Sequence, residues 1–340
     1  MNRQRIIDAI DLANKIVRRH LDVQPGENVL IVADPETDME IYLALAGAVQ
    51  SLGAEYTVSL MPTRGKERAT YLTKPIENAL EASDVLIGVT KASGAPTYAR
   101  KVAELLGKKK LRALSMVMRE LDNYLKGAAT ADYEELENLG QRVARLWANA
   151  SEIRIRSESG SDFRAGVTKE PVMGHPVIVE CGLAREPGRE AAFSDGEVSQ
   201  RPFAGSAEGR LVIDGPVAGL RGLDPFELDV EGGKVTRLSG GGNRTRQLAS
   251  VFSRMSCAKH IAEIGLGLNP EALHNGDFEE EKKGQGNVHV AIGDDNFYGG
   301  SHACAIHWDM VLYEATVWLD DFVLFDKGKL QLERVLEASA

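Results

Sequence analysis

Hydrophobic positions in the first 150 residues follow two alternating patterns. Short continuous apolar runs, such as residues 29–33, indicate buried strands. Between them, apolar residues recur at the spacing of amphipathic helices, as in residues 6–17. Further strands are expected at 54–60, 84–89 and 111–117, and further helices at 34–53, 98–106 and 133–147. This alternation predicts an α/β domain over residues 1–150 with a doubly wound, mostly parallel sheet.

The pattern changes after residue 150. Apolar and polar residues alternate with a period of two, and glycine and proline become frequent, which is typical of short strands joined by turns. Strands are expected at 153–156, 209–214, 228–235, 287–293 and 303–312. We therefore predict a second domain over residues 151–340 that is mixed and largely β, and the chemistry argued below would make it the metal-binding catalytic domain.

Composition narrows the class of protein. The chain has 340 residues, of which 43% are hydrophobic and 26% charged, as in globular proteins. A net charge of −10 argues against binding to nucleic acid or to an anionic membrane. The amino-terminal residues lack the apolar core of a signal peptide, and no apolar run reaches membrane-spanning length. Three scattered cysteines, Cys181, Cys257 and Cys304, favour a reducing cytoplasm without a disulfide framework.

No sequence motif indicates a nucleotide cofactor. Neither the dinucleotide fingerprint GxGxxG after a strand nor a P-loop is present. The glycine run at 240–242 lacks a following helix start and is expected to be a flexible loop. The charged run at 279–283 is expected to be a solvated loop.

His307 and Asp309 lie two residues apart in the expected strand at 303–312. Residues two apart in a strand share a face, so both side chains would point away from Trp308 and Met310. An imidazole and a carboxylate on one side of a rigid strand can chelate a divalent metal. Taken alone, the pair is more often a surface hydrogen bond.

Three further residues could complete such a site. His289 alternates with valine and isoleucine in the strand at 287–293. The simplest interpretation is a half-buried histidine without a metal. Glu263 lies inside an apolar, glycine-rich stretch, so it should be paired with a cation or open to a cleft. Glu197 lies where a turn becomes a strand. Surface or structural roles are expected for the other histidines, which are His20, His175, His260, His274 and His302.

These segments together resemble metalloaminopeptidases of the aminopeptidase T and S type. The resemblance rests on Gly196-Glu197-Val198, on Ile261-Ala262-Glu263-Ile264, on residues 289–293 and on His307-Trp308-Asp309-Met310. It implies an α/β amino-terminal domain and a two-metal site in the second domain. The implied ligands are Glu197, Glu263, His289, His307 and Asp309, and the implied assembly is a homodimer.

The sequence departs from that family at two positions. Gly284 and Asn296 stand where the family has a glutamate and a tyrosine. Glu281 or Tyr298 are the candidates to replace them, and we take Glu263 and Tyr298 as the expected catalytic residues.

A second resemblance is to the 2,5-dihydroxypyridine ring-cleaving dioxygenases, which share this fold. It rests on residues 154–163, Glu186-Pro187-Gly188-Arg189, residues 265–270 and Trp318-Leu319-Asp320-Asp321. That family uses a single ferrous ion, has a histidine where this chain has Glu263, and lacks the first glutamate. Here His289, His307 and Asp309 have the composition of a two-histidine, one-carboxylate iron site.

Charge counting favours two metal ions. The carboxylates of Glu197, Glu263 and Asp309 would bring three negative charges together, and metal ions would neutralise them. Five donors also exceed the roughly three protein ligands of a single catalytic zinc. The leading hypothesis is therefore a metallohydrolase with two ions of zinc, cobalt or manganese, whose activated water attacks an amide bond of a small molecule or short peptide. The alternatives are the iron(II) dioxygenase and a non-catalytic metal-binding protein.

Overall fold

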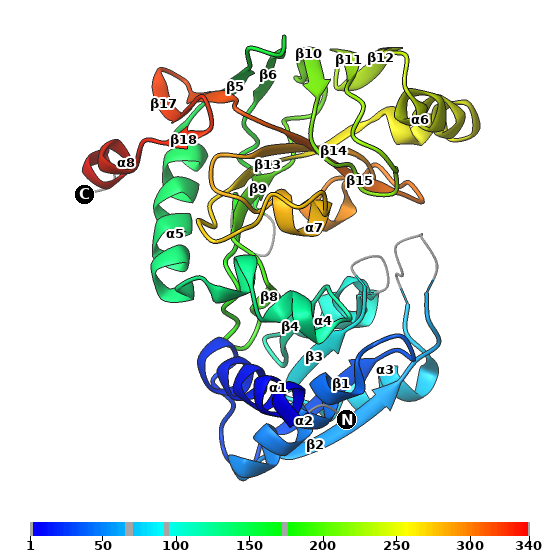
Figure 1. The fold of residues 1–340 in the computed structure, drawn as a ribbon, viewed down its shortest axis with the longest axis vertical. Coiled ribbons are helices and arrows are strands. Elements are labelled where there is room, and N and C mark those ends of the chain that lie inside the picture. Colours follow the sequence, from blue (N-terminus) through cyan, green and yellow to red (C-terminus); the bar gives the residue numbers. More distant parts are fainter. Residues whose placement is uncertain (1–2, 65–70, 92–94, 172–175, 339–340) are drawn as a thin grey trace. The chain divides into compact units, whose positions relative to one another are not determined.

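The computed structural model describes residues 3–64, 71–91, 95–171 and 176–338 (Figure 1). The chain forms two compact units, and neither is continuous in sequence. Unit 1 comprises Met1–Tyr133 and Cys181–Asp195, and unit 2 comprises Glu134–Glu180 and Gly196–Ala340. The sequence pattern suggested a single boundary near residue 150. The structure differs because the chain returns to unit 1 to add one more strand.

Unit 1 contains a parallel sheet of five strands, as the alternation of strands and helices predicts. The strand order is β2-β1-β3-β4-β8. The inner strands β1, β3 and β4 are almost entirely buried, whereas the edge strand β2 is largely exposed, so the apolar runs mark the centre of the sheet. The strands are β1 (Asn28–Ala33), β2 (Glu55–Leu60), β3 (Val85–Val89), β4 (Arg112–Met116) and β8 (Glu190–Phe193).

Helices of unit 1 supply the apolar side chains that pack on this sheet. Leu30 and Leu86 from the strands share a core with Val102 and Leu105 from α4. The helices are α1 (Arg3–Lys15), η1 (Ile16–His20), α2 (Met39–Ser51), α3 (Lys74–Leu80), η3 (Pro96–Tyr98), α4 (Arg100–Gly107), η4 (Leu121–Tyr124) and η5 (Gly127–Thr130).

The helix expected over residues 34–53 starts later than predicted, because α2 begins at Met39. Asp34 instead closes a turn, in which the Thr37 amide donates to its carbonyl at 3.0 Å and the Glu36 amide donates to its carboxylate at 3.0 Å. A side chain that bonds its own downstream backbone competes with helix formation.

Unit 2 is dominated by two antiparallel sheets, which confirms the mixed, largely β prediction. One has the order β12-β11-β10-β6-β5-β16-β17-β18, and the other has the order β15-β14-β13-β9-β7. The strands are β5 (Glu152–Arg156), β6 (Asp162–Gly166), β7 (Ile178–Glu180), β9 (Glu197–Gln200), β10 (Glu208–Ile213), β11 (Phe226–Glu231), β12 (Lys234–Ser239), β13 (Ile261–Gly267), β14 (Val288–Gly293), β15 (His307–Leu312), β16 (Thr316–Leu319), β17 (Phe322–Asp326) and β18 (Lys329–Leu330).

Few helices accompany these sheets in the described part of unit 2, and the short helix α7 contacts strand β15. They are α5 (Tyr133–Asn149), α6 (Asn243–Arg254), η6 (Ser256–Lys259), α7 (Phe278–Glu281), η7 (Asn296–Tyr298) and α8 (Leu332–Ala338). None of the helices within the described ranges has the length and apolar character needed to cross a membrane.

Cys257 and Cys304 form a disulfide, so the expectation of a chain without one is wrong. The two cysteines are 47 residues apart, and this spacing matches no motif from which a disulfide could be predicted. The fold brings η6 next to the segment before β15, where Cys304 packs against a cluster that includes Val251, Ala258 and Ile306.

Candidate metal centre

One face of the sheet β15-β14-β13-β9 carries the predicted donor residues. Cross-strand pairing sets Asp309 beside Ala291 and Ala291 beside Glu263. A neighbouring row sets His289 beside Gly265, and Gly265 beside Ser199. Side chains alternate across strands, so every donor shares one face and the small residues between them leave room for it.

Glycine at position 265 is a requirement of this arrangement. A Cβ atom there would overlap Cε1 and Nε2 of His289, whose ring lies across the strand at that point. His307 pairs in the same way with Gly293, and Glu197 with Gly267. The opposite face of these strands is apolar, with Ile264, Val290 and Met310 fully or almost fully buried, as the alternation in the sequence predicts.

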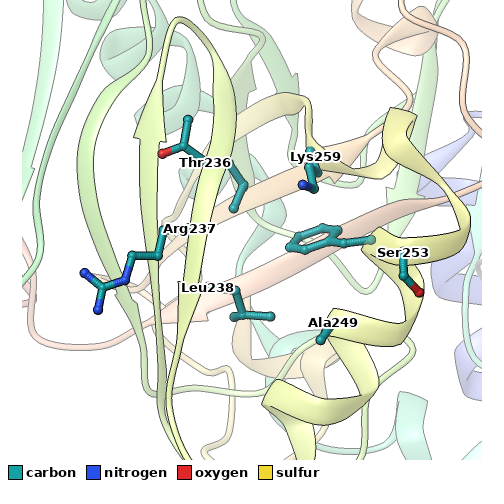
Figure 2. A pocket seen from close by; sticks show the side chains of 8 residues that line it. Thr236, Arg237, Leu238, Ala249, Ser253 and Lys259 are labelled. Atoms are coloured by element: carbon teal, nitrogen blue, oxygen red, sulfur yellow. The ribbon is translucent and has the colours of Figure 1, made fainter.

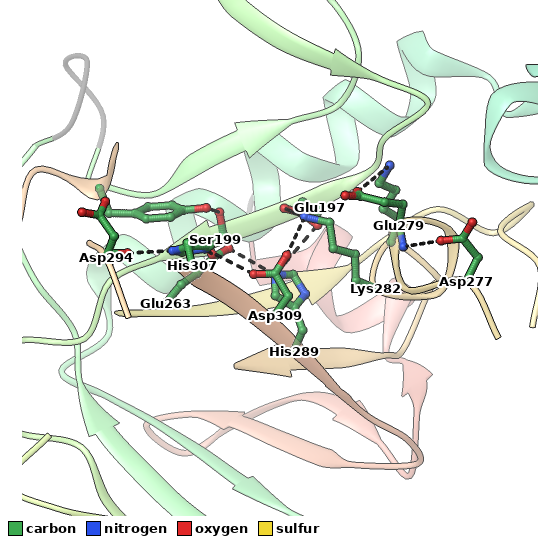
Figure 3. A network of polar contacts seen from close by, with 12 residues as sticks. Glu197, Ser199, Glu263, Asp277, Glu279, Lys282, His289, Asp294, His307 and Asp309 are labelled. Carbon is green, nitrogen blue, oxygen red and sulfur yellow. Dashed lines mark hydrogen bonds and ion pairs between the residues drawn. The ribbon is translucent and has the colours of Figure 1, made fainter. Parts of the chain in front are cut away.

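The sheet brings together all five side chains that sequence analysis proposed as metal ligands (Figure 3). Glu263 is central, because Oε1 lies 3.1 Å from His289 Nε2 while Oε2 lies 2.8 Å from His307 Nε2. Asp309 Oδ1 is 3.2 Å from His307 Nε2, and Glu197 Oε2 is 3.9 Å from His289 Nε2. The five therefore form two groups that share Glu263: Glu197, Glu263 and His289, and Glu263, His307 and Asp309.

Lys282 also belongs to this centre, and sequence analysis missed it. Its ammonium lies 3.3 Å from Glu197 Oε1 and 3.1 Å from Asp309 Oδ2 (Figure 3). The prediction of a solvated loop at 279–283 is wrong, since Glu279 and Lys283, for example, are buried. The run contains both acidic and basic residues, so its members can neutralise one another when buried. This mixture of charges is the sequence feature that could have indicated a buried segment.

The electrostatics of the centre follow from these contacts. Burial lowers the pKa of His289, but Glu197 and Glu263 outweigh it and raise the pKa to about 9. Burial raises the pKa of Glu263, whereas the hydrogen bonds with His289 and His307 hold it well below its usual range. Burial likewise opposes ionisation of Asp309, and Lys282 together with His307 keeps its pKa low. The carboxylates are therefore ionised and available to a cation.

The hydrogen bonding of His307 fits a metal ligand. Its Nδ1–H donates to the Asp294 carbonyl at 2.7 Å. In a neutral imidazole the Nε2 lone pair then points at the carboxylates of Glu263 and Asp309, which is unfavourable unless a cation lies between them. A backbone carbonyl that fixes the tautomer in this way is a common partner of a metal-binding histidine. Oxygen and imidazole donors suit a divalent transition metal.

Tyr298 lies beside the donors. Its hydroxyl accepts a hydrogen bond from Ser199 at 3.2 Å, and its ring stacks on that of His307 with centroids 6.0 Å apart. Burial, together with nearby carboxylates such as Glu263, raises its pKa well above 10. The phenol is therefore protonated at neutral pH and can donate a proton or a hydrogen bond.

Two other positions that the sequence singled out have partners outside the donor set. Glu281 binds Tyr313, His274 and the Gly276 amide, so it does not take the place of the glutamate absent at Gly284. The Asn296 side chain donates to Asp294.

The remaining histidines have structural contacts. His260 Nε2 is 3.0 Å from Asp295, His302 donates to the Cys257 carbonyl at 2.8 Å, and buried His20 lies 2.6 Å from the Gly182 carbonyl. His175 lies outside the described residues.

A separate surface pocket of about 290 Å³ lies between β12 and α6 (Figure 2). Its lining includes Leu238, Phe252 and Lys259 and contains no carboxylate or imidazole. It therefore offers no ligands for a metal and does not overlap the centre described above.

The parallel sheet of unit 1, the two antiparallel sheets of unit 2 and the converging donors define an α/β protein with a candidate metal centre. The chain belongs to the 2,5-dihydroxypyridine 5,6-dioxygenase family, whose model matches residues 12–332. A curated 2,5-dihydroxypyridine 5,6-dioxygenase of Pseudomonas putida KT2440 is 30% identical over 195 residues. That match spans 52% of this chain and only 53% of the relative.

Two solved structures share the fold over almost the whole chain. The 2,5-dihydroxypyridine dioxygenase of Pseudomonas putida KT2440 superposes with a TM-score of 0.82 at 20% identity, covering 96% of this chain and 97% of that one. AmpT of Thermus thermophilus gives a TM-score of 0.70 at 15% identity, covering 96% and 99%. The aminopeptidase resemblance is thus correct for the fold, but the family is that of the dioxygenases.

The leading hypothesis of a metallohydrolase is therefore wrong. The family match over residues 12–332 supports the dioxygenase alternative instead. The count of five donors left out Lys282, whose ammonium contacts Glu197 and Asp309 and reduces the net negative charge of the centre.

Proposed function

We propose that this protein is a metal-dependent dioxygenase that opens a dihydroxylated pyridine ring, with ferrous iron as its metal. The observation that carries the proposal is the set of Glu263, His289, His307 and Asp309, drawn from the two donor groups that share Glu263, in a chain of the dioxygenase family. Two imidazoles with a carboxylate are the ligand composition of many non-haem iron oxygenases. When bound, ferrous iron would supply the one-electron chemistry that lets O₂ react with an aromatic ring.

The residues around the donors have separate roles in this proposal. His289, His307, Asp309 and Glu263 would hold the ion, and the Asp294 carbonyl orients His307 through its Nδ1–H. Tyr298 keeps its proton because its pKa is raised, so it can donate to an oxygen of the substrate or of the opened ring. The Ser199 hydroxyl donates a hydrogen bond to the Tyr298 hydroxyl oxygen and so helps to hold the phenol in position.

The proposal is tested by oxygen uptake. Protein loaded anaerobically with ferrous iron is mixed with 2,5-dihydroxypyridine, and O₂ consumption is recorded together with the loss of the ring's ultraviolet absorbance. We expect one O₂ consumed per ring opened. Absence of uptake with this compound and with other dihydroxylated pyridines would count against the function.

Tyr298→Phe separates binding from proton transfer in the same assay. The variant removes only the hydroxyl, so we expect metal binding to remain and turnover to fall by about 10²–10⁴-fold, the usual contribution of a positioned proton donor. Ser199→Ala is the matched control, because it removes the hydrogen bond to Tyr298 but leaves the phenol in place, and it should cost much less. Equal losses in both variants would assign Tyr298 a structural role.

Assembly and location are further proposals that start from the sequence. We propose a homodimer in the cytoplasm, where the disulfide between Cys257 and Cys304 would be open to reduction. Analytical ultracentrifugation of the purified protein tests the assembly, and cell fractionation tests the location. A monomer at micromolar concentration would contradict the first, and recovery outside the cytoplasmic fraction would contradict the second.

A further inference from the structure

The backbone that follows Lys282 is held against the end of β13 by hydrogen bonds. Lys282 follows α7 directly, and the segment after it runs along the end of β13. There the Asn269 amide donates to the Lys283 carbonyl at 2.9 Å, and the Gln285 amide donates to the Asn269 carbonyl at 2.9 Å. A Cβ atom on Gly267 would overlap this segment, so glycine there lets it approach the sheet. The lysine backbone is thus anchored beside the metal centre.

The lysine side chain joins the two donor groups. Glu197 belongs to one group and Asp309 to the other, and the ammonium contacts an oxygen of each at 3.3 and 3.1 Å (Figure 3). All three side chains are largely withdrawn from solvent, with exposed fractions of 13% for Lys282, 1% for Glu197 and 9% for Asp309. Charges at such distances and such low exposure interact strongly, because water screens them poorly.

Counting this cation changes the charge balance of the centre. The three carboxylates of Glu197, Glu263 and Asp309 contribute −3 and Lys282 contributes +1, which leaves −2. One divalent ion brings the total to zero. Two divalent ions would bring the net charge of this buried centre to +2. A second ion would also have to compete with the Lys282 ammonium for the oxygens of Glu197 and Asp309 that the ammonium already contacts. Burial of uncompensated charge is costly, so the single-ion state is favoured.

We propose that Lys282 takes the place of a second metal ion, so that a site with ligands for two ions binds one. The proposal rests on the proposed function only in treating these residues as a metal centre. Lys282 is a positioning residue in this account. Its ammonium holds Glu197 and Asp309 and excludes another cation, without contacting the reacting atoms.

The number of bound ions tests the proposal directly. Metal-free full-length protein is titrated with Mn²⁺ by calorimetry, and the bound metal is measured by elemental analysis after gel filtration. We expect one ion per chain for the natural sequence. Two ions per chain in the natural sequence would overturn the proposal before any variant is made.

Variants at position 282 separate charge from side-chain length. Lys282→Met removes the charge but keeps the length, so we expect a second ion to bind at least about tenfold more tightly than in the natural sequence. Lys282→Arg keeps the charge and should stay at one ion. The proposal would be contradicted if Lys282→Met had a normal circular dichroism spectrum and still bound one ion with unchanged affinity. If Lys282→Met does not fold, the single ion expected in the natural sequence and in Lys282→Arg carries the test, and two ions in either overturns it.

The outcomes distinguish this inference from the proposed function. One ion in the natural sequence, a second in Lys282→Met and no oxygen uptake would leave the inference standing and remove the dioxygenase. Oxygen uptake with one ion in both proteins would leave the dioxygenase and remove the inference. No bound Mn²⁺ in any of the proteins would contradict both. Lys259→Met, a change at the pocket beside α6, is the control for loss of a lysine far from the donors.

Discussion

Glu263 is the side chain on which both donor groups depend. One of its oxygens faces His289 and the other faces His307, and it is almost completely buried. Glu263→Gln keeps the shape but replaces one charged oxygen with a donor that repels a cation. We expect metal affinity to fall by more than about 100-fold, beyond the usual cost of losing an outer-shell partner. Calorimetric titration measures the loss.

Glu279→Gln is the matched control for that change. Glu279 is also buried, but its carboxylate faces Lys283 at 4.0 Å and it belongs to neither donor group. We expect its metal affinity to remain within about threefold of the natural value, the context-dependent scatter of such measurements. Equal losses in the two variants would mean that Glu263 acts through folding and not as a ligand.

His289 gives the metal-free protein a distinctive pH dependence. Its pKa in the folded chain is about 9, above the ordinary value of 6.5, so the protonated form stabilises the fold. That stabilisation is fully present below pH 6.5 and is lost as the pH rises through 9. The melting temperature of the metal-free protein should therefore fall between pH 6.5 and 9, as followed by circular dichroism.

His289→Gln isolates this contribution, because it removes the titrating group and keeps a polar side chain. The difference in melting temperature between the natural sequence and the variant should shrink across the same window. A difference that stays constant or grows with pH would contradict the assignment. Bound metal should also abolish the dependence, since a ligated imidazole carries no proton.

At the level of elements, the alternation of donors with small residues positions the centre. Gly265→Ala puts a Cβ atom on the ring of His289. Because backbone pairing holds β13 and β14 together, the ring has to move and the sheet does not. We expect metal affinity to fall by about tenfold or more with the β-sheet spectrum retained, measured by titration and circular dichroism on the same sample.

Gly47→Ala is the control for a glycine substitution as such. Gly47 lies inside α2, and an added Cβ would meet nothing within 4 Å. We expect it to stabilise the protein by about 0.5–1 kcal/mol through helix propensity and to leave metal binding unchanged. If Gly265→Ala binds metal as tightly as Gly47→Ala, the geometric argument fails.

The sequence could predict those elements in which local pattern and tertiary role agree. The strands β14 and β15 follow from strict alternation, and the same alternation puts His289, His307 and Asp309 on one face. Glu263 could be found because burying a carboxylate in an apolar strand costs free energy unless a cation lies beside it. Lys282 could not be found in this way, because it lies in irregular backbone after a four-residue helix and only the tertiary fold brings it to Asp309.

At the scale of the whole molecule, the disulfide supports the centre from a distance. It joins Cys257 to Cys304, and the Cys304 amide donates to the Asp294 carboxylate at 3.2 Å. Asp294 in turn accepts the Nδ1–H of His307 through its carbonyl. The crosslink thus restrains the segment that orients a proposed ligand.

We expect reduction of this disulfide to destabilise the protein by about 2–4 kcal/mol, the usual effect of closing a loop of this size. Denaturant unfolding with and without dithiothreitol measures the change. The double variant Cys257→Ala, Cys304→Ala should be insensitive to the reductant. Sensitivity in the double variant, or none in the natural sequence, would show that the crosslink does not contribute.

The fifth strand of the parallel sheet, β8, comes from residues 190–193, after part of unit 2 has already been passed. Many multidomain proteins fold from the amino terminus while the ribosome is still adding residues. Here one edge of β4 has no partner until that later stretch emerges, although β4 and its other neighbour β3 are both complete about 70 residues earlier. A nascent chain stalled after β4 but before β8 would expose an unpaired sheet edge. A chaperone would therefore be needed most if translation were arrested in this interval.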